Sequence, residues 1–147
     1  MPTVVTFRNA SCEISMDGGL TYLDMSNYDS KLELSGGHRQ LAESFVFGQD
    51  YALVSEGKRG HLDIKLTQMY TEEAGGPAEL IRIAYENGAN VAIRWTAKGK
   101  VTGNYLFTSD PGFLQEPPYP FGEAGSAKEV VLTTTFYVPR VTKTVVV

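Results

Sequence analysis

The side chains best suited to catalysis in this 147-residue chain are its one cysteine, Cys12, and its two histidines, His38 and His61. A thiol nucleophile needs a base within hydrogen-bonding reach. The three residues occupy separate segments: Cys12 lies in a strand-like run, His38 follows a Gly-Gly turn, and His61 begins another strand. We therefore expect Cys12 to be a small buried residue and both histidines to face solvent, without a nucleophilic site.

The sequence also lacks a convincing motif for metal binding or phosphate binding. A single cysteine excludes a disulfide within the chain and a cysteine-rich zinc site, and the two histidines lack the short spacing of metal ligands. The run Gly99–Thr102 resembles a phosphate loop only superficially, because position 94 is arginine and Lys100 is followed by valine. Glu72 and Glu73 are adjacent acids, and nothing beyond adjacency suggests acid–base work. We expect no enzyme and no cofactor.

The charge balance argues against tight nucleic-acid binding. The chain has 13 Lys+Arg and 17 Asp+Glu, a formal net charge of −4. Proteins that grip DNA through its phosphates display a basic patch, and Lys58-Arg59 is too short to form one. The sequence also lacks both a signal-peptide pattern and the roughly 18 consecutive apolar residues of a membrane helix. We expect a soluble protein that is made in a reducing cytoplasm and does not insert into membranes.

The stretch from Gly60 to Ala97 organises the fold. Apolar residues alternate with polar ones over 61–70, which is the period of a half-buried strand. Pro77 suits the first turn of a helix, residues 78–86 carry apolar side chains at helical spacing, and Asn87-Gly88 supplies a stop. Alternation resumes over 91–96, so the stretch predicts a strand, one short helix and a strand.

The residues before this stretch predict further strands. We expect strands over 3–8, 12–16 and 20–23, followed by a hairpin of Lys31–Leu34 and Gln40–Phe47 that turns at Gly36-Gly37. That hairpin would place the acidic residues Glu33 and Glu43 in one sheet. Residues 50–59 are predicted to be a connection with room for one turn of helix.

The residues after it predict a second hairpin over 92–107 and a last regular strand over 129–138. Between them, 109–127 is too long for a tight turn, and its aromatic residues Phe113, Tyr119 and Phe121 favour an ordered surface loop over disorder. About eight short strands and one helix are typical of an antiparallel β-sandwich or barrel with a short flanking α-helix. We expect one domain, 1–147, with an N-terminal arm of about 1–23 and a β-prone tail of about 139–147.

The two ends of the chain are the strongest functional signal from composition. Val4 and Val5 at the start, and Val145 and Val146 at the end, lie in β-prone runs without the charges, prolines or bulges that protect sheet edges. Exposed in a monomer, such edges invite aggregation. We expect another copy of the chain to occupy them; the alternative is frayed termini in a monomer.

Several segments in order resemble a known family. They are Asp24-Met25-Ser26-Asn27, Lys31–Ser35, Glu43–Gly48 and Gly60–Leu66, followed by the Gly103-Asn104-Tyr105 strand, a long loop and a Thr-rich closing strand. This order resembles the tail tube proteins of long-tailed bacteriophages, over most of the chain from 24 to 138. The first 23 residues match less well.

The resemblance implies a non-enzymatic structural protein. Members of the family fold as a β-sandwich flanked by a helix and assemble as hexameric rings, which stack into the tail tube that carries DNA into the host. The implied partners are further copies, the tail terminator, the tape measure, and baseplate or tip proteins; the implied location is the virion tail, after synthesis in the host bacterial cytoplasm.

In such a ring, Glu33 and Glu43 become candidates for the lumen, while Val4, Val5, Val145, Val146 and the loop aromatics Phe113, Tyr119 and Phe121 become candidates for contacts between subunits or rings. A sixfold ring would carry a formal charge of 6 × −4 = −24, which repels DNA from the wall and lets it slide.

Three other interpretations stay open. One is the tube or ring protein of a contractile tail or of a related injection or secretion machine. Another is a monomeric β-sandwich module that binds a ligand. The last is a small hydrolase, disfavoured because Cys12, His38 and His61 lie in unrelated segments.

Overall fold

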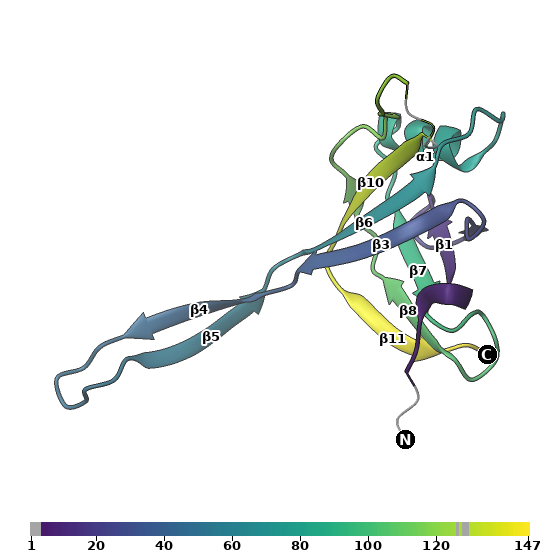
Figure 1. Ribbon diagram of the computed structural model, residues 1–147. Helices are drawn as coiled ribbons and strands as arrows, with labels where there is room; N and C mark the ends of the chain where they lie inside the picture. Colours follow the sequence, from purple (N-terminus) through teal and green to yellow (C-terminus); the bar gives the residue numbers. More distant parts are fainter. Residues whose placement is uncertain (1–3, 126, 128–129) are drawn as a thin grey trace.

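Two antiparallel sheets form the body of the molecule, and a long two-stranded arm extends from it (Figure 1). The computed structural model describes residues 4–125, 127 and 130–147. The five-stranded sheet has the order β11-β8-β7-β1-β2, the four-stranded sheet has the order β3-β6-β10-β9, and the arm pairs β4 with β5. The elements are η1 (Phe7–Asn9), β1 (Ser11–Ser15), β2 (Leu23–Asp24), β3 (Asp29–Gly36), β4 (Arg39–Ser44), β5 (Leu53–Arg59), β6 (Leu62–Met69), α1 (Pro77–Glu86), β7 (Ala92–Thr96), β8 (Tyr105–Ser109), β9 (Phe113–Leu114), β10 (Val131–Val138) and β11 (Val141–Val145).

The hydrophobic core lies between the two sheets. Strand β6 turns Ile64 and Leu66 inward, and β10 buries every second residue, including Phe136. The five-stranded sheet contributes Ile93 and Trp95, and the Trp95 ring stacks on Phe107 of β8 with 5.8 Å between centroids. The two sheets therefore enclose one hydrophobic core, and the predicted antiparallel sandwich with a single short helix is confirmed.

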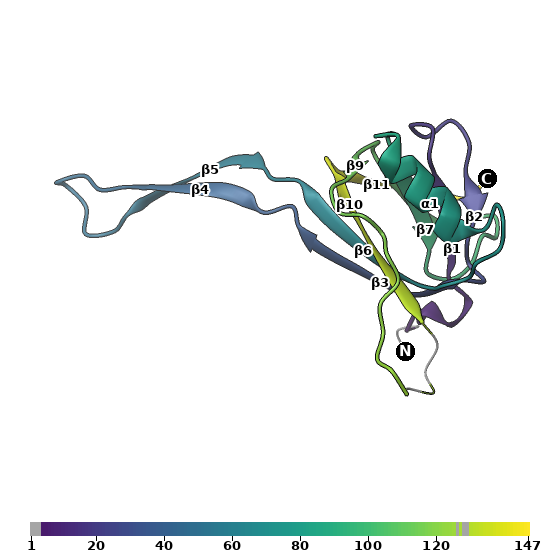
Figure 2. The same ribbon diagram turned by 90° about the horizontal axis from the view of Figure 1, so that it is seen from above.

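The helix α1 forms where the sequence predicts it. Pro77 occupies its first turn, and Gly88, with φ of +63°, ends it in the left-handed conformation that glycine tolerates. Its inward face sends Ile81 and Ala84 into the core cluster. Figure 2 shows α1 against the body, on the side away from the tip of the arm.

The predicted hairpin over 31–47 is wrong. Strand β3 pairs with β6 and β4 pairs with β5, so residues 29–44 and 53–69 are the two sides of one long ribbon that reverses between Ser44 and Leu53. Gly36 and Gly37 both have positive φ, but they bend the ribbon instead of reversing it. At the bend, a Cβ on Gly36 would lie 2.6 Å from the carbonyl oxygen of His61, so only glycine allows the neighbouring strand so close.

Three smaller predictions are also corrected. Residues 4–8 form no strand and instead lead into the 3₁₀ turn η1, while the strand expected over 20–23 shrinks to Leu23–Asp24. The connection expected over 50–59 instead contains β5, which pairs with β4. The sequence pattern of 50–59 alone does not indicate this strand, because it depends on the pairing. Thr3 and Glu129, where two strands were expected to begin, lie outside the described residues.

The remaining strands follow the predictions closely. β1 matches 12–16, the β7–β8 hairpin pairs Trp95 with Phe107, and the tail after Pro139 forms β11 against β8. The long loop contains one short strand, β9, and returns to the sheet at a bridge between Phe121 and Val131. The N-terminal segment and the C-terminal tail thus both supply strands to the five-stranded sheet.

Gly112 ties the two sheets together. Its N–H donates to Val91 O at 2.8 Å and its carbonyl accepts from Val91 N at 3.0 Å, while a Cβ there would lie 2.0 Å from Tyr137 O.

We expect Gly112→Ala to lower the free energy of unfolding by about 2–4 kcal/mol, because the backbone around Tyr137 would have to move. Urea denaturation measures this. Gly122→Ala, which meets nothing within 4 Å, is the control; equal stability of the two variants would contradict the close packing.

Candidate assembly surfaces

Cys12 lies in the body of the molecule, whereas His38 and His61 lie on facing sides of the ribbon at its bend. Cys12 is buried in β1, and burial, reinforced by the charge of Asp29, raises the pKa of its thiol. His61 is exposed near the bend of the ribbon, with Nε2 2.9 Å from Asp63 Oδ1, and His38 is exposed on the other side of the ribbon. Across 4–125, 127 and 130–147, no three His, Cys, Asp or Glu residues are grouped as metal ligands.

The arm is a long surface that no other described element covers. Every residue from 38 to 60 is exposed except Ala52, which is half-buried. The exposed apolar side chains include Leu41, Phe45, Phe47, Tyr51 and Val54, of which Phe47 and Tyr51 near the tip are the most open. An isolated two-stranded ribbon is marginally stable in water, and apolar patches of this extent mark interaction sites. The arm is therefore a candidate interaction surface.

Glu33 and Glu43 do not share a sheet. Glu33 lies on β3 opposite Lys65, and its Oε1 is 2.6 Å from Lys31 Nζ, which lowers the pKa of the carboxyl group. Glu43 lies on the arm opposite Val54. Because the ribbon bends between them, one acid belongs to the body and the other to the arm.

The outer face of the four-stranded sheet is polar. It alternates with the buried face and carries Lys31, Glu33, Ser35, Asp63, Lys65, Thr67, Thr133, Thr135 and Tyr137. A shallow depression of about 440 Å³ on this face is bordered by Tyr119 and Phe121 of the long loop. At one edge of the sheet, β9 leads into a loop rich in proline, a residue that lacks the backbone N–H needed to pair with a further strand. At the other edge, β3 pairs with no further strand among the described residues.

The three loop aromatics are all more than half exposed: Phe113 55%, Tyr119 58% and Phe121 57%. Phe113 stacks on Tyr137 with 5.6 Å between centroids. Beside this pair lies a groove of about 610 Å³, which we call the root groove because the base of the arm forms one wall. Its lining is Arg59, Gly60, His61, Asn90, Pro111, Gly112, Phe113, Gln115, Tyr137, Val138 and Pro139.

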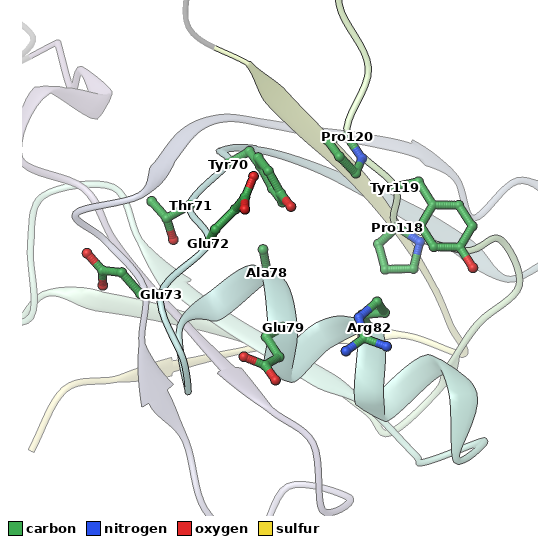
Figure 3. Close-up of a pocket in the computed structure, with 10 residues that line it drawn as sticks. All are labelled: Tyr70, Thr71, Glu72, Glu73, Ala78, Glu79, Arg82, Pro118, Tyr119 and Pro120. Carbon is green, nitrogen blue, oxygen red and sulfur yellow. The ribbon is translucent and has the colours of Figure 1, made fainter.

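A smaller pocket of about 270 Å³ lies between α1 and the proline-rich part of the loop (Figure 3). Glu72 and Glu73 line it together with Glu79, whose Oε2 accepts the Gly75 N–H at 3.3 Å. Arg82 also lines it, but its guanidinium already pairs with Glu86 at 2.9 Å. The pocket collects acidic side chains and the hydroxyl groups of Tyr70, Thr71 and Tyr119, and no histidine lines it.

The terminal valines are placed unequally. Val4 and Val5 are 81% and 49% exposed, whereas Val146 is 8% exposed because its backbone bonds with Gly103 and Asn104 hold it against the body. Val145, 48% exposed, ends β11, which pairs with β8 on one side. Among the described residues, the outer side of β11 is unpaired, so this edge is available to another chain.

Sequence reasoning missed a buried ion cluster on the five-stranded sheet. Glu13 lies 2.8 Å from Arg94 and 2.9 Å from Lys100, and the Arg94 guanidinium sits 4.0 Å above the ring centre of Tyr22. Burial alone would raise the pKa of Glu13, but its bonds with the two cations lower it. In the sequence, the one sign of this cluster is the acidic Glu13 between the core residues Cys12 and Ile14. Its partner Arg94 becomes evident only from the pairing of β1 with β7.

A second buried polar cluster lies within the four-stranded sheet, where β3 begins its pairing with β6. Asp29 Oδ1 accepts from Gln68 Nε2 at 2.7 Å, while Asp29 Oδ2 and Gln68 Oε1 are buried without a hydrogen-bond partner. Burial raises the pKa of Asp29 to about 6, although the hydrogen bond from Gln68 opposes the shift, and the charge of Asp24 adds to it. Two acceptors without donors make the charged form of Asp29 costly here.

Comparison with solved structures shows the fold in large assemblies. The chain superposes on a chain of the anti-feeding prophage baseplate with a TM-score of 0.72 and 12% identity, covering 99% of this chain and 97% of that one. It matches a chain of the sheath–tube complex of an extracellular contractile injection system, PVC, with a TM-score of 0.64, 13% identity and coverage of 97% and 93%. It also matches a chain of the anti-feeding prophage tube-terminating cap with a TM-score of 0.61 and 15% identity, covering 99% of this chain and 93% of that one.

No family model and no curated protein matches the chain. In the described part of the chain, no helix combines the length and apolarity needed to cross a membrane. At these identities the comparisons establish the fold alone.

We expect Asp29 to lower the stability of the protein as pH rises from about 4 to about 6, against the opposite contributions of Glu13, Asp24 and Glu33, whose pKa values are lowered in the folded state. The folded state binds a proton on Asp29 more tightly than the unfolded chain does, so the protonated form stabilises folding below this range and the gain is lost above it. The change amounts to about 3 kcal/mol at most. Urea denaturation at pH 4 and pH 8, on unassembled protein, measures it.

Asp29→Asn removes the charge and should flatten this dependence, with higher stability than the wild type at pH 8. The matched control is Glu43→Gln on the exposed arm, which should keep the wild-type slope. A wild-type slope in Asp29→Asn would show that Asp29 does not cause it.

Proposed function

We propose that this chain is a structural subunit that assembles with copies of itself into rings, stacked as the tube of a contractile injection machine. The observation that carries the proposal is the arm, which extends a ribbon of exposed apolar residues beyond its own body (Figure 1). Exposed in water, it would be a site of aggregation; buried between subunits, it is an assembly element.

The fold comparisons support the contractile alternative over the tube of long-tailed phages. The chains that this one resembles come from the baseplate, the sheath–tube complex and the cap of such machines, and each is covered over 93% or more of its length. The likeness does not single out the tail tube of long-tailed phages. We therefore take the partners to be further copies of the chain and the terminator, baseplate or tip that close a tube, in an extracellular particle made in a bacterial cytoplasm.

Within this proposal the outer face of the four-stranded sheet lines the channel. The face is mostly polar and its central strands are paired on both sides, with the loop that carries Tyr119 and Phe121 along its border, whereas the opposite face is core. Glu33 would then face the lumen, and Glu43, on the arm, would lie among subunit contacts. On this face Lys31 and Lys65 are balanced by Glu33 and Asp63, so it presents no excess of positive charge to hold an anionic cargo such as DNA.

The purified protein should form rings or tubes as its concentration rises. Light scattering measures the mass and electron microscopy shows the shape. A strictly monomeric protein at high concentration, without polymers in the images, would exclude the proposed function.

Substitution of the arm separates assembly from folding. Leu41→Ser combined with Val54→Ser removes two exposed apolar side chains, so it should leave the melting temperature within a few degrees and abolish or greatly weaken polymerisation. Leu20→Ser, at a position 85% exposed on the body, is the control. Normal tubes from the double variant would remove the arm from the assembly.

Thiol labelling tests the lumen assignment. In assembled tubes, Ser35→Cys on the outer face of β3 should react with a small maleimide but not with a maleimide on a large polymer, because the channel excludes the polymer. Glu86→Cys, exposed on α1, is the control for an outward position. Cys12 is buried and contributes little background. Equal reaction of Ser35→Cys with both reagents would place this sheet outside the channel.

A further inference from the structure

The tip of the arm, residues 45–51, is an apolar knob. Phe45 is 78% exposed, Phe47 112% and Tyr51 82%, and Asp50 is the only charged residue among the seven. Each aromatic side chain buries about 150–250 Å² when covered, so the three together offer about 450–750 Å². That is less than the roughly 800 Å² per partner of a standard interface. The knob therefore suits a contact that is repeated many times in an assembly.

The root groove is the complementary hollow. Its exposed lining is more apolar than polar, with the Phe113–Tyr137 stack as one wall and Pro111, Val138 and Pro139 around it. Its volume of about 610 Å³ accommodates two or three large side chains. Arg59 stands on its rim, and neither Arg59 nor Asp50 forms an ion pair with another described residue.

The knob cannot reach the groove of its own chain. Arg59 and Gly60 belong both to the base of the ribbon and to the wall of the groove, and the ribbon leads straight away from them (Figures 1 and 2). Six residues of β4 alone place the tip about 20 Å beyond that base. The pairing of β4 with β5 keeps the arm extended and prevents its tip from folding back onto the body. A tip that fills this groove therefore comes from a second molecule.

We propose that the tip of the arm of one copy docks in the root groove of a second copy, with Phe47 against the Phe113–Tyr137 stack and Asp50 beside Arg59. This inference rests on the proposed self-assembly and names the surfaces that would meet. Knob and hollow are different surfaces of one chain, so the contact is head-to-tail, and each copy can both give a tip and receive one. Such a contact propagates through an assembly instead of stopping at a dimer.

Site-specific cross-linking of the full-length protein tests the docking. Phe47→Cys protein is mixed with Phe113→Cys protein under assembly conditions and treated with a short bismaleimide. The expected product is a cross-linked dimer that contains one copy of each variant. Val101→Cys, 63% exposed in the turn between β7 and β8, replaces Phe113→Cys as the control and should give little dimer.

Charge reversal provides a second measurement that does not alter the aromatic residues. Asp50→Arg and Arg59→Asp should each raise the concentration needed for assembly about tenfold, and the double variant should restore it, because the pair is re-formed with opposite polarity.

The outcomes separate the docking from the proposed function. Dimers with Phe113→Cys but not with Val101→Cys support the docking. Assemblies that form without this cross-link, or that cross-link equally at both positions, overturn the docking and leave the ring-forming function intact. Protein that does not associate at all overturns both.

Discussion

Strand β6 is the element on which the rest of the structure depends. It pairs with β3 along one side and with β10 along the other, over nearly its whole length. Its inner face buries Ile64, Leu66 and Gln68 against the five-stranded sheet, while its outer face stays polar. Because both edges of β6 are satisfied, its register fixes which residues of β3 and β10 face the core, and a shift of one residue would exchange the two faces.

The arm follows from the same ribbon. β3 and β6 continue as β4 and β5 after the bend at Gly36 and Gly37, but there the second sheet ends and nothing covers the ribbon. The alternation that fills the core in the body thus becomes exposed Leu41 and Val54 in the arm. One covalent element serves two purposes: it stabilises the monomer at one end and presents an interaction surface at the other.

The body buries polar side chains in two clusters, whose effects on stability differ. The Glu13 cluster is well compensated, since Arg94 and Lys100 both bond its carboxylate. The Asp29–Gln68 pair is not, because two acceptors there lack donors at neutral pH. Incompletely satisfied polar groups of this kind cost stability in low-dielectric surroundings. The protonation of Asp29, the first residue of β3, therefore affects stability within the same sheet that we propose as the channel lining.

The sequence by itself determined the features that depend on local periodicity and backbone chemistry. Alternation predicted β6 and β7, a composition rich in Val, Thr, Phe and Tyr predicted β10, and Pro77 and Gly88 predicted the ends of α1. Only the tertiary structure decided what depends on pairing between distant residues: the partner of β3, the separation of Glu33 from Glu43, and the ion cluster around Glu13. A Gly-Gly pair allows a bend as readily as a reversal, and the choice between them is made by the strand opposite, through hydrogen bonds to residues about 30 positions away.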